Sequence, residues 1–357
     1  MAGIRQRSDR IAAADSHHVH LIHLWINNDC CCTYLLIYGN SALMPKSIVV
    51  IGSLNLDLVA RVDRIPVPGE TIIGLDFETY SGGKGANQAT AVARLGAPVK
   101  MIGKLGSDAF ANQLRDGLEK SGVDTSCVEN VAGASGTALI ESSADGENSI
   151  VVIPGANAHL LPEDIDRYRR EIEQAAIILA QLEIPRETTE HLAHVARSAG
   201  VPLLLDPAPA YRLSRAVLSC VTWLTPNETE TRLLLGLNPD GVSSHSAPEA
   251  AARLLDMGSR SVILKLGARG VYLAGQEVEP AAIEACEVEV VDSTGAGDAF
   301  NGAFAFAMVH RGMEVHEAAA FACGAAALSV TRAGAQASMP TLEECELFLG
   351  RCRASRP

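Results

Sequence analysis

From Ser47 onward, short runs of β-branched and other apolar residues alternate with amphipathic segments of helical period. A parallel β-sheet covered by helices produces this alternation, because each crossover between parallel strands needs a connection long enough for a helix. The pattern therefore predicts an α/β fold with a mainly parallel central sheet. The expected strands are 47–51, 99–102, 176–180, 201–205, 221–224 and 261–266.

Two segments, 56–80 and 137–153, interrupt the alternation. Both read as strands joined by turns, such as Val67-Pro68-Gly69 and Ala144-Asp145-Gly146, rather than as strand–helix units. We interpret them as a small antiparallel lid that emerges from a main domain spanning 46–355.

The first 45 residues differ from the rest of the chain. They mix histidines such as His17 and His18 with the run Cys30-Cys31-Cys32, and adjacent cysteines lack the spacing of a zinc site. Met44-Pro45-Lys46 leads directly into the first expected strand. We interpret 1–45 as an atypical extension that is disordered or not part of the functional chain, which then begins near Met44.

Charge and cysteine usage narrow the classes of function. The 357 residues carry a formal net charge of −13, which argues against a nucleic-acid or anionic-membrane surface. The apolar pieces of the N-terminal stretch are too short and interrupted for a membrane span. The nine cysteines show no paired CxxC spacing, so reduced thiols and a cytoplasmic location are expected.

The stretch Asp292-Ser293-Thr294-Gly295-Ala296-Gly297-Asp298 places a carboxylate among glycines where an apolar helix is about to start. Glycines allow close backbone approach, and the first amides of a helix attract anions. Asp298 is then best explained as a base that accepts a hydroxyl proton beside a transferring phosphoryl group. The alternative is a glycine turn in which Asp298 serves only as a helix-start residue.

Of two further motifs, one follows the first expected strand and the other opens an expected helix. Asn55 and Asp57 follow the first strand and share a face of an extended chain, so they could grip vicinal hydroxyl groups or simply form a capping turn. In Gly82-Gly83-Lys84-Gly85-Ala86-Asn87, glycines beside a lysine could permit close approach to a polar ligand or simply form a tight loop. The chain contains neither GxGxxG after its first strand nor GxxxxGK[ST], which disfavours a dehydrogenase-type dinucleotide site and excludes a P-loop.

Other polar groups follow the later strands. Glu183 comes after the strand at 176–180, and Asn227 and Glu230 come after the strand at 221–224. The last two could orient phosphates and a hydrated magnesium ion, or form a capping box. The glycines of 265–270 suit a nucleotide rim or a simple hairpin equally well.

These segments, in this order, resemble the ribokinase branch of the phosphofructokinase-B type sugar kinases. The resemblance runs from about Ser47 to the C-terminal helix, and GGKGAN at 82–87 and DSTGAGD at 292–298 match its two signatures. It implies a three-layer αβα sandwich with a small β lid, and ATP-dependent phosphorylation of D-ribose at the 5-hydroxyl. Deoxyribose, fructose or a nucleoside as the acceptor, or a non-catalytic sugar or nucleotide sensor, are the alternatives.

The resemblance also implies residue roles. Asp298 would be the catalytic base, and the amides of Gly295, Ala296 and Gly297 would form the anion hole. Glu230 would lie on the magnesium side. The implied sugar contacts are Asn55, Asp57, Gly83, Lys84, Asn87, Glu183 and Asp298, and the implied ATP contacts are Asn227, Lys265, Gly267, Arg269, Gly270, Gly297 and Cys323.

The family further implies a potassium ion beside the anion hole, held largely by backbone oxygens, and a homodimer formed through the lid. Cys323 departs from the family, because relatives often carry an asparagine there. The N-terminal extension has no family counterpart. The implied potassium-site residues are Asp292, Thr294, Ser329, Arg332, Gly334 and Ser338.

Overall fold

The structure, a computed structural model, describes residues 22–25, 31–34, 47–143, 148–237 and 246–354. The chain divides into two compact units, 1–45 and 46–357. In the first unit, strands β1 (Ile22–Trp25) and β2 (Cys31–Tyr34) pair antiparallel. The rest of the expected extension, including His17, His18 and Cys30, lies outside the described residues.

Nine strands form the main sheet in the described part of the second unit, in the order β15-β14-β13-β12-β11-β10-β3-β6-β7. In this order, the seven neighbouring strands from β13 across to β7 pair parallel. Strands β14 and β15 extend the sheet antiparallel at its other end. The mainly parallel sheet is confirmed. The bounds are β3 (Ile48–Ile51), β6 (Val99–Leu105), β7 (Asp124–Asn130), β10 (Ile177–Ala180), β11 (Leu203–Leu205), β12 (Trp223–Leu224), β13 (Ser261–Lys265), β14 (Val271–Gly275) and β15 (Val278–Ile283).

Three of these strands were not expected from the sequence: β7, β14 and β15. Strands β7 and β15 are the two edges of the sheet and are only partly buried, so their sequences alternate with polar residues instead of forming apolar runs. Strand β14 follows a glycine turn and pairs back onto β13, so the segment after Lys265 is a hairpin.

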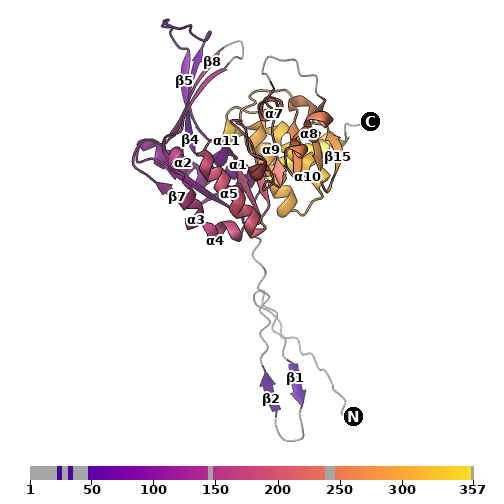
Figure 1. Ribbon diagram of the computed structural model, residues 1–357. Helices are drawn as coiled ribbons and strands as arrows, with labels where there is room; N and C mark the ends of the chain where they lie inside the picture. The colour runs from indigo at the N-terminus through magenta and orange to yellow at the C-terminus, as the bar shows by residue number, and fades with distance from the viewer. Residues whose placement is uncertain (1–21, 26–30, 35–46, 144–147, 238–245, 355–357) are drawn as a thin grey trace. The chain divides into compact units, whose positions relative to one another are not determined.

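Helices cover both faces of the sheet and make the expected three layers (Figure 1). In β3, Ile48 and Val50 enter one core and Val49 and Ile51 the other, as alternation along a strand requires. The first core contains residues of α1 (Lys84–Arg94), α2 (Ala109–Lys120), α9 (Ala296–Val309), α10 (Val315–Ser329) and α12 (Leu342–Ala354). The second contains residues of α3 (Pro162–Arg167), α4 (Arg169–Glu173), α5 (Arg186–Ala199), α6 (Arg215–Leu218), α7 (Glu228–Leu234) and α8 (Ala247–Asp256).

Helix α9 is the central helix of the first core. Its residues from Asp298 to Ala307 are all buried, because the segment is apolar on every side and packs against both α1 and α10. Phe304 meets Trp223 of β12 edge to face, with ring centroids 5.2 Å apart. The middle of α9 is therefore packed against the sheet.

The lid is a second sheet with the strand order β5-β4-β8-β9, which projects from the body of the unit (Figure 1). The expected turn at 67–69 is present, since Glu70 N donates to Val67 O at 3.0 Å, whereas the expected turn at 144–146 lies outside the described residues. The bounds are β4 (Asn55–Val62), β5 (Asp76–Gly82), β8 (Gly136–Ser143) and β9 (Asn148–Ile153).

The prediction of a small antiparallel lid was wrong for its central pair of strands. Each hairpin is antiparallel, but the central pair, β4 and β8, runs parallel. Strand β4 follows β3 and strand β8 follows β7, and both leave the main sheet at the carboxyl ends of parallel strands. Two strands that leave the same edge outward must run in the same direction.

Candidate functional site

Polar residues from five strand ends converge at the carboxyl edge of the main sheet, where open α/β sheets bind ligands. Asn55 follows β3, Glu183 follows β10 and Asp206 follows β11. Asn227 follows β12 and Lys265 ends β13. Helices α1 and α9 both begin at this edge, so the two glycine-rich motifs face one site.

Asp298 is a buried charged group of this site, with 4% of its surface exposed. It lies in the first turn of α9, which starts after Gly295 at a φ of +77° that disfavours side chains. Its Oδ2 accepts from Asn87 Nδ2 at 2.9 Å, and its Oδ1 accepts from Gln88 Nε2 at 3.0 Å. Both donors belong to α1, so the two motifs meet in direct contact.

Burial raises the pKa of Asp298 to about 6, and the positive charge of Lys84 limits that rise. Burial would by itself lower the pKa of Lys84, but Asp298, Asp206 and Glu183 raise it, so this lysine stays charged. A carboxylate with a pKa near neutrality, beside a charged lysine, has the properties of a general base.

A second cluster lies where the lid joins the body. Glu183 Oε2 accepts from Ser53 Oγ at 2.5 Å, from Lys84 N at 3.2 Å and from Asn55 Nδ2 at 3.5 Å. Gly83 adopts a φ of +87°, and a Cβ there would lie 2.6 Å from Asn55 N. Only glycine therefore lets α1 start this close to the turn after β3.

Asp57 lies two residues beyond Asn55 on β4, as expected for a shared face. Burial raises its pKa to about 7, and the negative charges of Glu183 and Asp298 add to the effect. The side-chain amide of Asn157, which is 1% exposed, fixes this corner. Its Nδ2 donates to Asn55 Oδ1 at 2.7 Å, and its Oδ1 accepts from Leu54 N at 2.9 Å.

A cavity of about 780 Å³ has Asp298 in its wall. Its wall includes the backbone of the α9 start and the side chains of Lys84, Asp206 and Lys265. Gly267 and Gly270 of the β13–β14 hairpin also line it, so that hairpin is a cavity rim as well. The volume is typical of sites for small molecules such as nucleotides.

Asn227 and Glu230 form a capping box, which was one of the two roles predicted from their spacing in the sequence. Glu230 N donates to Asn227 Oδ1 at 2.8 Å, and Asn227 N donates to Glu230 Oε2 at 2.7 Å. Both residues also line the cavity. Burial and the charge of Asp206 raise the pKa of Glu230, while Lys265 opposes that rise.

Of the expected nucleotide contacts Cys323 and Arg269, only the first lines the cavity. Cys323 lines the cavity and is 5% exposed, and burial raises the pKa of its thiol to about 12, so it presents a neutral surface. The side chain of Arg269 does not line this cavity and instead pairs with Glu228 at 2.6 Å.

The two segments expected to hold a monovalent cation are adjacent. Asp292 Oδ2 accepts from Gly334 N at 2.8 Å, and Asp292 Oδ1 accepts from Thr294 N at 2.9 Å. Burial opposes ionisation of Asp292, but these hydrogen bonds hold its pKa below the usual range. The Arg332 side chain pairs with Glu344, which leaves only its backbone available to a cation. Ser329 and Ser338 are buried in the same region.

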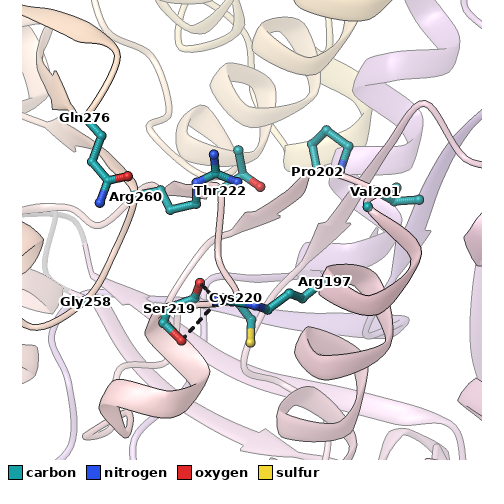
Figure 2. Close-up of a pocket in the computed structure, with 10 residues that line it drawn as sticks. Arg197, Val201, Pro202, Ser219, Cys220, Thr222, Gly258, Arg260 and Gln276 are labelled. Atoms are coloured by element: carbon teal, nitrogen blue, oxygen red, sulfur yellow. Dashed lines mark hydrogen bonds between the residues drawn. The ribbon is translucent and has the colours of Figure 1, made fainter.

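Another cavity, of about 680 Å³, lies at the opposite, amino edge of the sheet (Figure 2). Its wall includes the residues just past the ends of α5, α6 and α8, namely Gly200, Ser219 and Gly258. Arg197 Nη1 donates to Ser219 O at 2.6 Å, which neutralises one helix carboxyl end. The polar strand ends converge at the other edge, so we place the functional site at the carboxyl edge.

Sequence reasoning missed three side chains that organise the site: Gln88, Asp206 and Asn157. Gln88 Nε2 donates to Asp298 and also to Asp206 Oδ2 at 3.1 Å. Asp206 in turn accepts from Lys265 Nζ at 2.8 Å. The position of Asp206 directly after a buried strand was the signal that could have identified it.

Comparisons with known proteins agree with this geometry. The model of the pfkB family carbohydrate kinases matches residues 45–342. The chain is 39% identical over 307 residues to the ribokinase of Haemophilus influenzae, covering 86% of this chain and 99% of that protein. It is also 39% identical over 305 residues to the deoxyribokinase of Salmonella typhi, covering 85% and 98%.

A solved structure of Arabidopsis thaliana ribokinase complexed with ribose and ATP is similar at a TM-score of 0.78 and 35% identity, with 86% of this chain and 99% of that chain covered. Within the described residues no helix is long and apolar enough to cross a membrane. The matched segment includes every residue of the carboxyl-edge site. The chain belongs to the pfkB family of carbohydrate kinases.

Proposed function

We propose that this enzyme is an ATP-dependent ribokinase that converts D-ribose to D-ribose 5-phosphate. The observation that carries the proposal is that Asp298 and Lys84 both line the 780 Å³ cavity, while Lys84 N also donates to Glu183 of the Asn55–Glu183 cluster. A sugar bound at the cluster and ATP bound in the cavity would meet at the Asp298 carboxylate.

In the proposed step, Asp298 accepts the proton of the ribose 5-hydroxyl. The hydroxyl oxygen forms a bond to the γ-phosphorus as the bond from that phosphorus to the β,γ-bridging oxygen breaks, and ADP leaves. The amides from Gly295 to Gly297 stabilise the charge on the transferring group. Asn55, Asp57, Lys84, Asn87 and Glu183 hold the sugar in line.

The residues present also fit the two expected cations. Magnesium prefers oxygen ligands and keeps several waters. Since both oxygens of Glu230 already accept hydrogen bonds within the capping box, Glu230 would hold the ion through water. Magnesium would neutralise phosphate charge. Potassium would bind backbone oxygens around Asp292, Thr294 and 329–338 and add positive potential beside the anion hole.

The decisive assay is ribose-dependent release of ADP, with and without potassium. Asp298→Asn should lower turnover by at least ~100-fold, the lower end of general-base effects, with little change in ribose binding. Near-normal turnover of this variant would refute the role of Asp298. If no sugar produces any ADP release, a non-catalytic sensor is favoured instead.

Deoxyribose is the second candidate acceptor, because the deoxyribokinase of Salmonella typhi and the ribokinase of Haemophilus influenzae are each 39% identical to this chain. A panel of ribose, deoxyribose, fructose and adenosine as acceptors distinguishes the alternatives. Ribose is favoured if its kcat/KM exceeds that of deoxyribose.

We further propose a homodimer that pairs through the lid. Strand β9 exposes apolar side chains on both faces, with Ile150 57% and Val151 56% exposed, and Phe77 of β5 is 60% exposed. Apolar patches of this kind on a sheet edge need cover. Sedimentation should give a dimer, and Ile150→Lys combined with Val152→Lys should give a monomer. A monomeric unmodified protein would refute the proposal.

A further inference from the structure

The ammonium group of Lys265 lies against the first turn of α9. Lys265 ends β13, its side chain is 14% exposed, and its Nζ donates to Asp206 Oδ1 at 2.8 Å. A Cβ built on Gly297 would lie 3.1 Å from this Nζ. The positive charge is therefore next to the backbone that would bind the transferring phosphoryl group.

An ammonium has three donors, and Asp206 is the only hydrogen-bond partner of Lys265 Nζ in the part of the chain that the structure describes. Lys265 lines the same cavity as Gly295, Ala296 and Asp298. Its remaining donors thus have access to a ligand in that cavity. A buried ion pair with a purely structural role would not require this direction.

The lysine is also tied to the base through a single amide. Gln88 Nε2 donates to Asp206 Oδ2 at 3.1 Å and to Asp298 Oδ1 at 3.0 Å. Gln181 Nε2 donates to Gln88 Oε1 at 2.8 Å and so fixes which way the amide points. Gln88, Gln181, Asp206 and Asp298 are all buried, so the spacing between base and ammonium is rigid.

We propose that Lys265 is a catalytic residue whose ammonium contacts the γ-phosphoryl group during transfer, and that Asp206 and Gln88 are positioning residues that fix it relative to Asp298. The inference rests on the proposed kinase function. The lysine would supply a compact positive charge opposite the helix amides, so that the transferring group is held from two sides.

The test uses two variants of the full chain. Lys265→Met alone leaves Asp206 buried without its cation, so a loss of activity there has two explanations. The double variant Asp206→Asn with Lys265→Met removes both charges and retains an acceptor for Gln88. We expect it to fold, with a thermal midpoint within a few degrees of the unmodified protein.

We expect the double variant to lose turnover by about 100-fold, as removal of one preorganised donor typically does. By isothermal titration calorimetry it should bind β,γ-imido-ATP at least ~10-fold more weakly while binding ADP unchanged, one decade being about 1.4 kcal/mol. Turnover restored to the unmodified level would overturn the proposal and leave a structural ion pair. Equal losses for both nucleotides would overturn the assignment to the γ-phosphoryl group.

The positioning role of Gln88 has its own readout. Gln88→Leu should shift the acid limb of the kcat profile to higher pH, because the hydrogen bond from Gln88 lowers the pKa of Asp298. An unmoved limb would contradict this role. The calorimetric titrations of nucleotide need no sugar. They therefore remain informative even if no sugar acceptor makes the unmodified protein release ADP. That result would refute the proposed function and leave nucleotide contact by Lys265 to be judged by calorimetry.

Discussion

Replacing Asp298 with asparagine should stabilise the folded protein at alkaline pH while it removes the activity. The carboxylate is buried, and burial raises its pKa from 3.8 to about 6. Asparagine has the same shape without the charge. The new Nδ2 has an acceptor at hand, because Asn87 Oδ1 is buried without a partner and a half-turn of that amide presents it to residue 298.

The magnitude follows from linkage. Because the pKa is higher in the folded state, folding takes up a proton between about pH 4 and 6, and stability is lost as the pH rises through this window. At about 1.4 kcal/mol per pKa unit, the charged carboxylate costs up to about 3 kcal/mol above pH 7. The gain from Asp298→Asn should therefore be near 3 kcal/mol at pH 8 and vanish near pH 4.

Urea unfolding at pH 8, 6 and 4.5, followed by tryptophan fluorescence, measures this difference. Asp116→Asn is the matched control, since Asp116 is exposed on α2 and its loss should change stability by less than about 0.5 kcal/mol. A variant that is no more stable than the unmodified protein at pH 8 would show that Asp298 is not destabilised by burial. A gain independent of pH would assign the effect to packing instead.

Three further predictions concern neighbouring groups. Gly297→Ala adds a methyl group 3.1 Å from Lys265 Nζ in the anion hole, so turnover should fall at least ~10-fold. The thermal midpoint should hold or rise, because alanine stabilises a helix more than glycine does. The KM for ribose should rise as the pH falls below about 7, where Asp57 becomes protonated, and Asp57→Asn should remove this dependence; an unchanged profile would exclude Asp57 as a sugar ligand. Asn157→Ala leaves Leu54 N and Asn55 Oδ1 without their partner, so it should cost about 1–3 kcal/mol in urea unfolding and raise the KM for ribose without changing ATP binding by calorimetry.

Sequence patterns predicted the parallel sheet and the position of both glycine motifs, because these depend on short stretches. A glycine-rich helix start, such as the one at Gly83, can be recognised from a few consecutive residues. The networks between motifs could not be predicted in this way. Gln88 and Asp298 are 210 residues apart, Gln88 and Asp206 are 118 apart, and Asn157 and Asn55 are 102 apart.

The same limit explains the remaining differences. The parallel pairing of β4 with β8 depends on where two distant hairpins leave the main sheet, which no local turn signal records. Arg269 was assigned to the nucleotide with the glycines beside it, but the short turn at 267–269 directs its side chain to Glu228. Glycine positions predict where the backbone can come close to a ligand. The direction of a long charged side chain such as that of Arg269 depends instead on which opposite charge lies nearest in the folded protein.

The lid and the proposed sugar cluster share their framework. In the lid sheet, Asn55 lies opposite Gly82 on one side and Gly136 on the other, so the first residue of β4 belongs to the lid and is also a sugar contact under the proposed function. If the lid closes over a bound sugar, closure and occupancy of the cluster are coupled. A change that favours the closed lid, even at the far tips of β5 or β9, would then increase the affinity for the sugar, by at most the factor by which it shifts the closing equilibrium. If the lids pair between subunits, each sugar site would report on the state of its neighbour.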